Sequence, residues 1–262
     1  MELKDIFQQK LVAYLATFRN ALSTESGEWA VKGFVDIYRN IYTISIDTKV
    51  ISKIIELTIF PILSQFAETN GYRIVLSEHQ NHYPDISFIL PDDSKIALDL
   101  KSTYRVSDTS VSGFTLGAFT GYFRKRSSSK NITFPYNGYL AHFVLGVIYS
   151  RSENTPDEHT VYTIDNLHNI ISVIQDFDFL LQEKWRIAND SPGSGNTKNI
   201  GSVKNIATLQ KGDGPFAKYG ETVFDDYWMN YLTRDMAETI DSDIPYRNLQ
   251  EYWQWRERAS KK

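Results

Sequence analysis

Cysteine is absent from this 262-residue sequence. Its absence excludes disulfide scaffolds, thiol nucleophiles and thiolate metal sites, and it fits a reducing compartment. Long apolar runs are scarce as well: none approaches the roughly 18 residues that a membrane-spanning helix needs. Met1 is not followed by a basic segment and an apolar run, so no signal peptide is predicted. We therefore expect a cytoplasmic protein without a membrane partner.

Positive charge is not in excess, because the formal net charge is −4. This value disfavours nucleic acid as a partner only weakly, since binding depends on local patches rather than on the average. Between Lys101 and Lys130 there are six basic residues against the single acid Asp108, and residues 256–262 are also mostly basic. These segments are either DNA-binding patches or solvated charge on loops.

The remaining composition is that of a folded enzyme-sized protein. Hydrophobic residues make up 42% of the chain and aromatic residues 14%, which excludes disordered and fibrous classes. No internal repeat and no linker long enough to separate two domains is visible. We expect one α/β domain over residues 1–262, with a mixed β-sheet flanked by helices and a catalytic core near 45–150.

Apolar periodicity locates the main elements. It predicts a surface helix over 3–22, used for packing or for dimer formation, and a second helix from Asp47 to about Gly71 that Pro61 kinks or interrupts. Strands are predicted at 86–90 and 96–101, on either side of a turn at 91–94. Residues 139–149 are apolar almost throughout, so they form either a buried strand or a core helix. Further along, residues 151–160 and 188–202 are predicted loops, and 222–262 is an aromatic and basic region.

Three charged residues stand out in the predicted hairpin. Asp99 and Lys101 lie two positions apart in an apolar strand, so their side chains point to one face. Asp85 stands just before the first strand. If Ile89 pairs with Lys95, then Asp85 lies opposite Asp99 and the two carboxylates share that face. A slip of one residue would place them on different faces, and an ordinary surface hairpin with an Asp–Lys pair is the alternative interpretation.

Such a pair of carboxylates predicts metal chemistry. Two carboxylates held close repel each other unless a cation lies between them, and hard oxygen ligands favour Mg²⁺. The carbonyl of Leu100 is a further candidate ligand. Lys101 could hold the attacking water or neutralise charge on phosphorus, which suits in-line hydrolysis of a phosphodiester.

At these residues the sequence resembles the PD…DxK nuclease superfamily and, within it, the EcoRV family of type II restriction endonucleases. Weaker similarity extends into the aromatic C-terminal region, so the resemblance covers nearly the whole chain. The matching runs are 46–52, 56–57, 80–85, 95–101, 114–117, 139–142 and 193–197.

The resemblance implies a role for each catalytic residue. Asp85 and Asp99 would bind Mg²⁺, together with the carbonyl of Leu100, and Lys101 would assist the water or the transition state. Glu56 would lie near the metal as an accessory acid and ligand, although a solvated carboxylate on a helix face is an equal alternative.

The resemblance also implies a DNA interface. A loop containing Gln80 and Asn81 would approach the minor groove, and a loop at 193–197 would enter the major groove. Asn196 carries the amide that matches adenine there. The implied DNA contacts are Gln80, Asn81, Ser102, Thr103, Gly193, Ser194, Gly195, Asn196 and Thr197.

The same resemblance implies a substrate and partners. The target would be the palindrome GATATC in double-stranded DNA, cut bluntly at its centre by a two-fold homodimer. A cognate DNA methyltransferase would be present in the same host without direct contact. Departures from the family at His79, Ser102, Pro192 and Lys198 could change flanking preference but leave the catalytic set intact. A repair or mobile-element nuclease and a catalytically silent DNA-binding protein are the competing hypotheses.

Overall fold

The computed structural model describes residues 1–79, 82–154, 156–193 and 197–259. Contacts divide the chain into two compact units. Unit 1 comprises Met1–Tyr72, Leu100–Ser112 and Gly146–Leu180, and unit 2 comprises Arg73–Asp99, Gly113–Leu145 and Leu181–Lys262. The prediction of a single domain stays a prediction.

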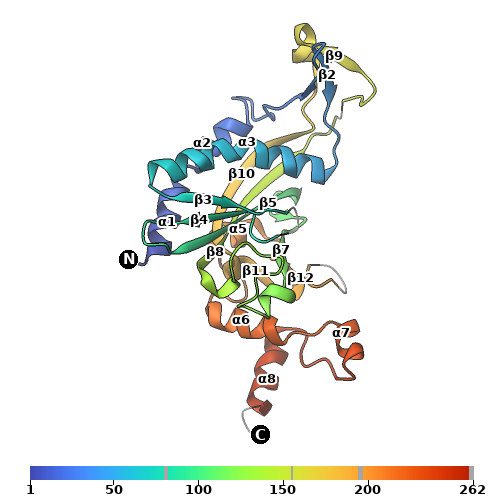
Figure 1. Ribbon diagram of the computed structural model, residues 1–262. Helices are drawn as coiled ribbons and strands as arrows, with labels where there is room; N and C mark the ends of the chain where they lie inside the picture. The colour runs from blue at the N-terminus through green and yellow to red at the C-terminus, as the bar shows by residue number, and fades with distance from the viewer. Residues whose placement is uncertain (80–81, 155, 194–196, 260–262) are drawn as a thin grey trace. The chain divides into compact units, whose positions relative to one another are not determined.

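Helices stand mainly at the two ends of the chain, and most strands lie between α3 and α5 (Figure 1). The helices are α1 (Leu3–Val12), α2 (Leu15–Leu22), α3 (Thr48–Thr69), α4 (Lys184–Ile187), α5 (Ile206–Lys211), α6 (Glu221–Asn230), α7 (Arg234–Thr239) and α8 (Leu249–Ala259), with 3₁₀ turns η1 (Gly121–Phe123), η2 (Tyr136–Gly138) and η3 (Ile164–Asn169). The strands are β1 (Gly33–Val35), β2 (Asn40–Thr43), β3 (Arg73–Leu76), β4 (Ile86–Ile89), β5 (Lys95–Ser107), β6 (Ser110–Val111), β7 (Thr115–Ala118), β8 (Tyr139–Arg151), β9 (Val161–Thr163), β10 (Ile174–Glu183), β11 (Ala188–Pro192) and β12 (Asn199–Ser202).

The largest sheet has the strand order β10-β8-β5-β4-β3, and β6 pairs with β5. Two smaller sheets have the orders β1-β2-β9 and β11-β12-β7. The predicted α/β class, a mixed sheet flanked by helices, is confirmed. β8 is buried along nearly its whole length, which explains why periodicity could not separate a strand from a core helix at 139–149.

The N-terminal prediction of one helix over 3–22 is wrong in detail, because the helix breaks after Val12. Here the packing of aromatic side chains outweighs the tendency of the segment to form one continuous helix. The rings of Phe7 and Tyr14 both contact Phe66 of α3, at centroid distances of 5.5 and 5.2 Å, whereas Phe18 of α2 contacts Phe179 of β10.

The second predicted helix is confirmed as α3. The Asp47 carboxylate accepts hydrogen bonds from the Lys49 and Val50 amides, and Gly71 adopts a left-handed conformation (φ +68°) just past its end. Pro61 does not interrupt the helix. α3 is long and apolar enough to cross a membrane by length and composition alone, a segment that the sequence analysis missed. One such helix is weak evidence, because the core helix of a folded protein passes the same test, and Ile51, Ile59 and Phe66 are fully buried.

Residues 188–202 are not the loop that their polar composition predicts. β11 and β12 pair antiparallel, with Ala188 opposite Ser202 and Pro192 opposite Ile200, and β12 also pairs with β7. Backbone hydrogen bonding on both edges of β12 forms these strands without an alternating apolar pattern.

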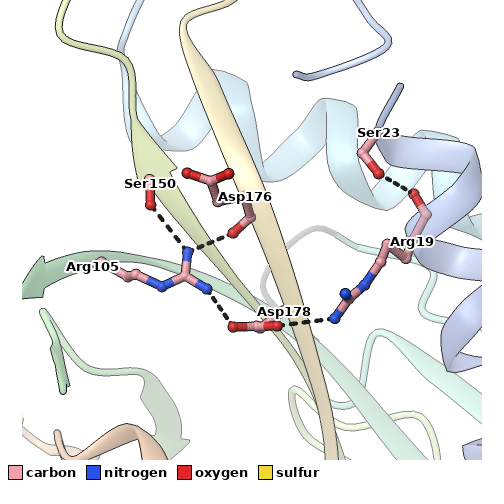
Figure 2. Close-up of polar contacts among 6 residues, drawn as sticks. All are labelled: Arg19, Ser23, Arg105, Ser150, Asp176 and Asp178. Carbon is pink, nitrogen blue, oxygen red and sulfur yellow. Dashed lines mark hydrogen bonds and ion pairs between the residues drawn. The ribbon is translucent and has the colours of Figure 1, made fainter. Parts of the chain in front are cut away.

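A charged cluster anchors β5 beyond Lys101 (Figure 2). The Arg105 guanidinium donates to Ser150 Oγ of β8 at 3.2 Å and to the carbonyl of Asp176 of β10 at 2.5 Å. It also forms an ion pair with Asp178, whose other oxygen accepts from Arg19 of α2 at 2.9 Å. One carboxylate therefore joins α2, β5 and β10 of unit 1.

We predict that Asp178→Asn lowers the free energy of unfolding by about 1.5–3 kcal/mol, because the partly buried guanidinium of Arg105 loses a charged hydrogen-bond partner, as does the exposed guanidinium of Arg19. Chemical denaturation measures the change. The matched control is Glu238→Gln, which removes the exposed ion pair to Arg234 and should cost at most about 0.5 kcal/mol. Equal losses in the two variants would contradict the assigned role of Asp178.

Candidate functional site

The hairpin of β4 and β5 has the register that brings the two aspartates together. Ile86 pairs with Leu98 and Ile89 with Lys95, and the Leu90 amide donates to the carbonyl of Ser94 at 2.9 Å. The pairing ends at Ile86 opposite Leu98, so Asp85 and Asp99 are the next residues on the two chain segments. The predicted register is confirmed, and the one-residue slip is excluded.

The charges of both carboxylates affect the pKa of Tyr122. Burial is the main cause that raises the pKa of this phenol above its ordinary value, and the charges of Asp99 and Asp85 raise it further. Both carboxylates therefore act on one phenol. Asp99 is itself buried, with 5% of its surface exposed, and Asp85 is half-buried.

Lys101 follows Asp99 by two residues on β5, so the two side chains lie on the same face of the strand. The half-buried Lys101 ammonium donates to the carbonyl of Leu100 at 3.1 Å. This contact places the ammonium of Lys101 beside the backbone carbonyl that follows Asp99.

This donor set fits a hard divalent cation. Two opposed carboxylates and a backbone carbonyl are oxygen ligands of the type that Mg²⁺ takes while keeping several waters. Within the described ranges, no three His, Asp or Glu side chains gather into a metal site, and Glu56 belongs to unit 1. Its carboxylate accepts from Lys53 on α3 at 2.7 Å, and its role as an accessory acid stays a prediction.

A buried cluster of aromatic rings packs around Tyr83, two residues before Asp85. The Tyr83 hydroxyl shares a hydrogen bond of 2.9 Å with Nδ1 of His142, and the Tyr83 ring stacks on Tyr122 at 5.2 Å. His142 stacks on Tyr136 with a centroid distance of 3.9 Å. Burial, and next the nearby Lys184, hold the pKa of His142 well below its ordinary value, so this imidazole is neutral at neutral pH.

Lys184 is the residue of this cluster that sequence reasoning missed. It is 2% exposed, and its ammonium lies 5.1 Å from the ring centroid of Tyr83, 5.5 Å from that of Phe123 and 5.8 Å from that of Tyr136. These cation–π contacts join residues about 50 to 100 positions away in sequence, so no local pattern marks them. The cluster therefore holds Tyr83, the residue two positions before Asp85.

The predicted DNA-contacting residues are only partly visible. Gln80, Asn81, Ser194, Gly195 and Asn196 lie outside the described residues. Gly193 and Thr197 stand between β11 and β12, where the Gly193 amide donates to the carbonyl of Asn199 at 3.1 Å. β11 ends directly before Gly193, and β12 begins at Asn199, two residues after Thr197. Gly193 and Gly201 pack closely together: a Cβ added to Gly201 would lie 2.7 Å from the Cα of Gly193.

The two residues after Lys101 are less open than the resemblance implies. Ser102 is half-buried, and its hydroxyl shares a hydrogen bond of 2.7 Å with that of Ser52 on α3. Thr103 is buried, with 4% of its surface exposed. A role of either residue in DNA binding stays a prediction.

Comparison with known proteins agrees with this geometry. The family model described as restriction endonuclease EcoRV matches residues 25–257. The chain is 37% identical over 245 residues to the type II restriction enzyme EcoRV of Escherichia coli, covering 92% of this chain and 97% of that protein. Among solved structures, the NlaIV restriction endonuclease is 12% identical, covers 94% of this chain and 95% of its own, and has a TM-score of 0.43, a likeness too weak to support an argument. From the match over most of its length, this chain belongs to the EcoRV family of restriction endonucleases.

Proposed function

We propose that this type II restriction endonuclease cuts double-stranded DNA at the palindrome GATATC, leaves blunt ends and depends on Mg²⁺. The observation that carries the chemistry is the register of β4 and β5, which opposes Asp85 to Asp99 two residues before Lys101. The identity of 37% to a relative named EcoRV supports the choice of target. We further propose that the enzyme is cytoplasmic and that the same host contains a methyltransferase that protects its DNA.

The proposed mechanism assigns one task to each residue. Asp85, Asp99 and the carbonyl of Leu100 hold the cation, which polarises the phosphate and lowers the pKa of the attacking water when bound. Lys101 holds that water with its ammonium, or neutralises the negative charge that grows on the phosphate oxygens. Glu56 is an accessory acid on α3.

Recognition is proposed for the two loops that the family resemblance identifies. The hairpin connection at 193–197 would enter the major groove, with the amide of Asn196 pairing with adenine N6 and N7. Gln80 and Asn81 would approach the minor groove. What supports the first assignment is that the strands on either side, β11 and β12, pair with each other and that β12 also pairs with β7.

Reading a palindrome requires two equivalent subunits, so we propose a homodimer. The sheet of β1, β2 and β9, with η3 beside it, offers the surface in unit 1, because Ile37 and Tyr38 are 88% and 78% exposed. A monomer rarely leaves so many large apolar side chains in water. The exposed apolar residues of these elements are Phe34, Val35, Ile37, Tyr38, Tyr42, Val161, Ile164 and Leu167.

Incubation of the protein with plasmid DNA and Mg²⁺, followed by sequencing of the DNA ends, tests the proposed function. We expect discrete fragments with blunt ends at the centre of GATATC. Ends at another palindrome would overturn the target alone. Ladders or smears would indicate a repair or mobile-element nuclease, and DNA that is shifted in a gel but uncut would indicate a pure binding protein.

We predict that Asp99→Asn lowers the cleavage rate at least about a thousandfold, because the cation loses a ligand worth several kcal/mol of transition-state stabilisation. The isosteric change preserves packing at this buried position. DNA binding in Ca²⁺, measured by gel shift, should survive. As a control, Asp92→Ala removes an exposed carboxylate from the turn of the same hairpin and should leave the rate unchanged. Full activity of Asp99→Asn would refute the assignment.

We predict that Ile37→Lys converts the dimer to a monomer, because a charge would have to be buried without a partner in the interface. Light scattering after size-exclusion chromatography measures the mass. The control is Ile240→Lys, which places the same charge at another exposed isoleucine, on the C-terminal side of α7, and should leave the dimer intact. A dimer that persists in Ile37→Lys would contradict this interface.

A further inference from the structure

Asp190 of β11 lies at the base of the hairpin that carries the proposed recognition loop. It stands three residues before Gly193, on the strand that leads into the loop. The far side of the loop is also held, since the carbonyl of Lys198 accepts from the Phe119 amide at 3.0 Å. How the loop meets DNA therefore depends on what fixes its two ends.

Two groups from the C-terminal region fix Asp190. The Tyr227 hydroxyl of α6 donates to the Asp190 carbonyl at 2.5 Å. The Leu249 amide, at the start of α8, donates to Oδ2 of Asp190 at 3.0 Å. Both the backbone and the side chain of this residue are thus engaged, and the contacts come from two different helices.

Tyr227 itself has little freedom to move. It is fully buried, and its ring centroid lies 4.8 Å from that of Tyr246, 5.3 Å from that of Tyr252 and 5.3 Å from that of Phe216. Such a packed aromatic cluster holds the phenol oxygen at one position. The hydroxyl of Tyr227 is therefore a rigid point against which β11 is placed.

We infer that Tyr227 and Asp190 are positioning residues for sequence recognition, which set the placement of β11, the strand that leads to Gly193, without touching the bases themselves. This inference rests on the proposed function. Hydrogen bonds to base edges need donors and acceptors within a few tenths of an ångström of their ideal places, whereas phosphate contacts tolerate more displacement. Loosening the base of the hairpin should therefore reduce discrimination between sequences more than it reduces DNA binding or the chemical step.

The test compares two tyrosines of one cluster. Tyr227→Phe removes the hydroxyl that bonds to β11. Tyr252 is an equally buried residue, and Tyr252→Phe removes a hydroxyl that bonds to Asp226 and Arg256 rather than to β11. The readout is the ratio of kcat/KM on the palindrome that the wild type cuts to kcat/KM on duplexes with one outer base pair replaced.

We expect this ratio to fall about tenfold in Tyr227→Phe, the equivalent of one good base contact, and to stay within about twofold of the wild type in Tyr252→Phe. Thermal unfolding should show a comparable loss of stability in both variants. A second pair is independent of the tyrosines. Asp190→Asn keeps an oxygen acceptor for the Leu249 amide and should retain discrimination, whereas Asp190→Ala should lose it.

Unchanged discrimination in Tyr227→Phe, or an equal loss in Tyr252→Phe, would overturn the inference while leaving the proposed function intact. If the wild type cuts at no fixed palindrome, the proposed function fails, and the inference fails with it. The two failures are therefore distinguished before any variant is assayed.

Discussion

The pairing of Ile89 with Lys95 across a short turn is the constraint on which the proposed chemistry depends. Because side chains in a strand alternate between faces, this register alone decides whether Asp85 and Asp99 oppose each other. Several features hold it in place. The Leu90 amide closes the turn onto Ser94, β3 pairs with the other edge of β4, and the ring cluster around Tyr83 fixes the chain just before Asp85. The proposed cation would relieve the repulsion between two carboxylates held close together in this way.

Two strands, β5 and β11, are each held by polar contacts close to a segment that is proposed to meet the substrate. Arg105 joins β5 to β8 and β10 beyond Lys101, while Tyr227 and Leu249 hold Asp190 on β11, the strand before the proposed recognition loop. In both cases, a buried or half-buried polar contact stands a few residues from the segment that is proposed to meet the substrate. Placing catalytic and reading groups on strands anchored in this way limits their displacement.

Local chemistry made the central elements predictable from sequence. The turn at 91–94 between two apolar runs indicated the hairpin, and the Asp47 cap and Gly71 indicated α3. Apolar periodicity could not identify β8 as a strand, because β8 is buried on both faces. It also predicted a loop at β11 and β12, because backbone pairing rather than an apolar pattern forms these two strands. Lys184 could not be found at all, since its partners lie far away in sequence and converge only in the folded chain.

The central proposal is that Asp85 and Asp99 bind one divalent cation together. Titration of the protein with Mn²⁺, followed by electron paramagnetic resonance, tests it without any cleavage. Asp85→Asn and Asp99→Asn should each weaken Mn²⁺ binding at least about tenfold, and the double variant should be little weaker than either, because residues that share one ligand are not independent. Single variants that bind Mn²⁺ like the wild type, or losses that simply multiply in the double variant, would contradict a shared site.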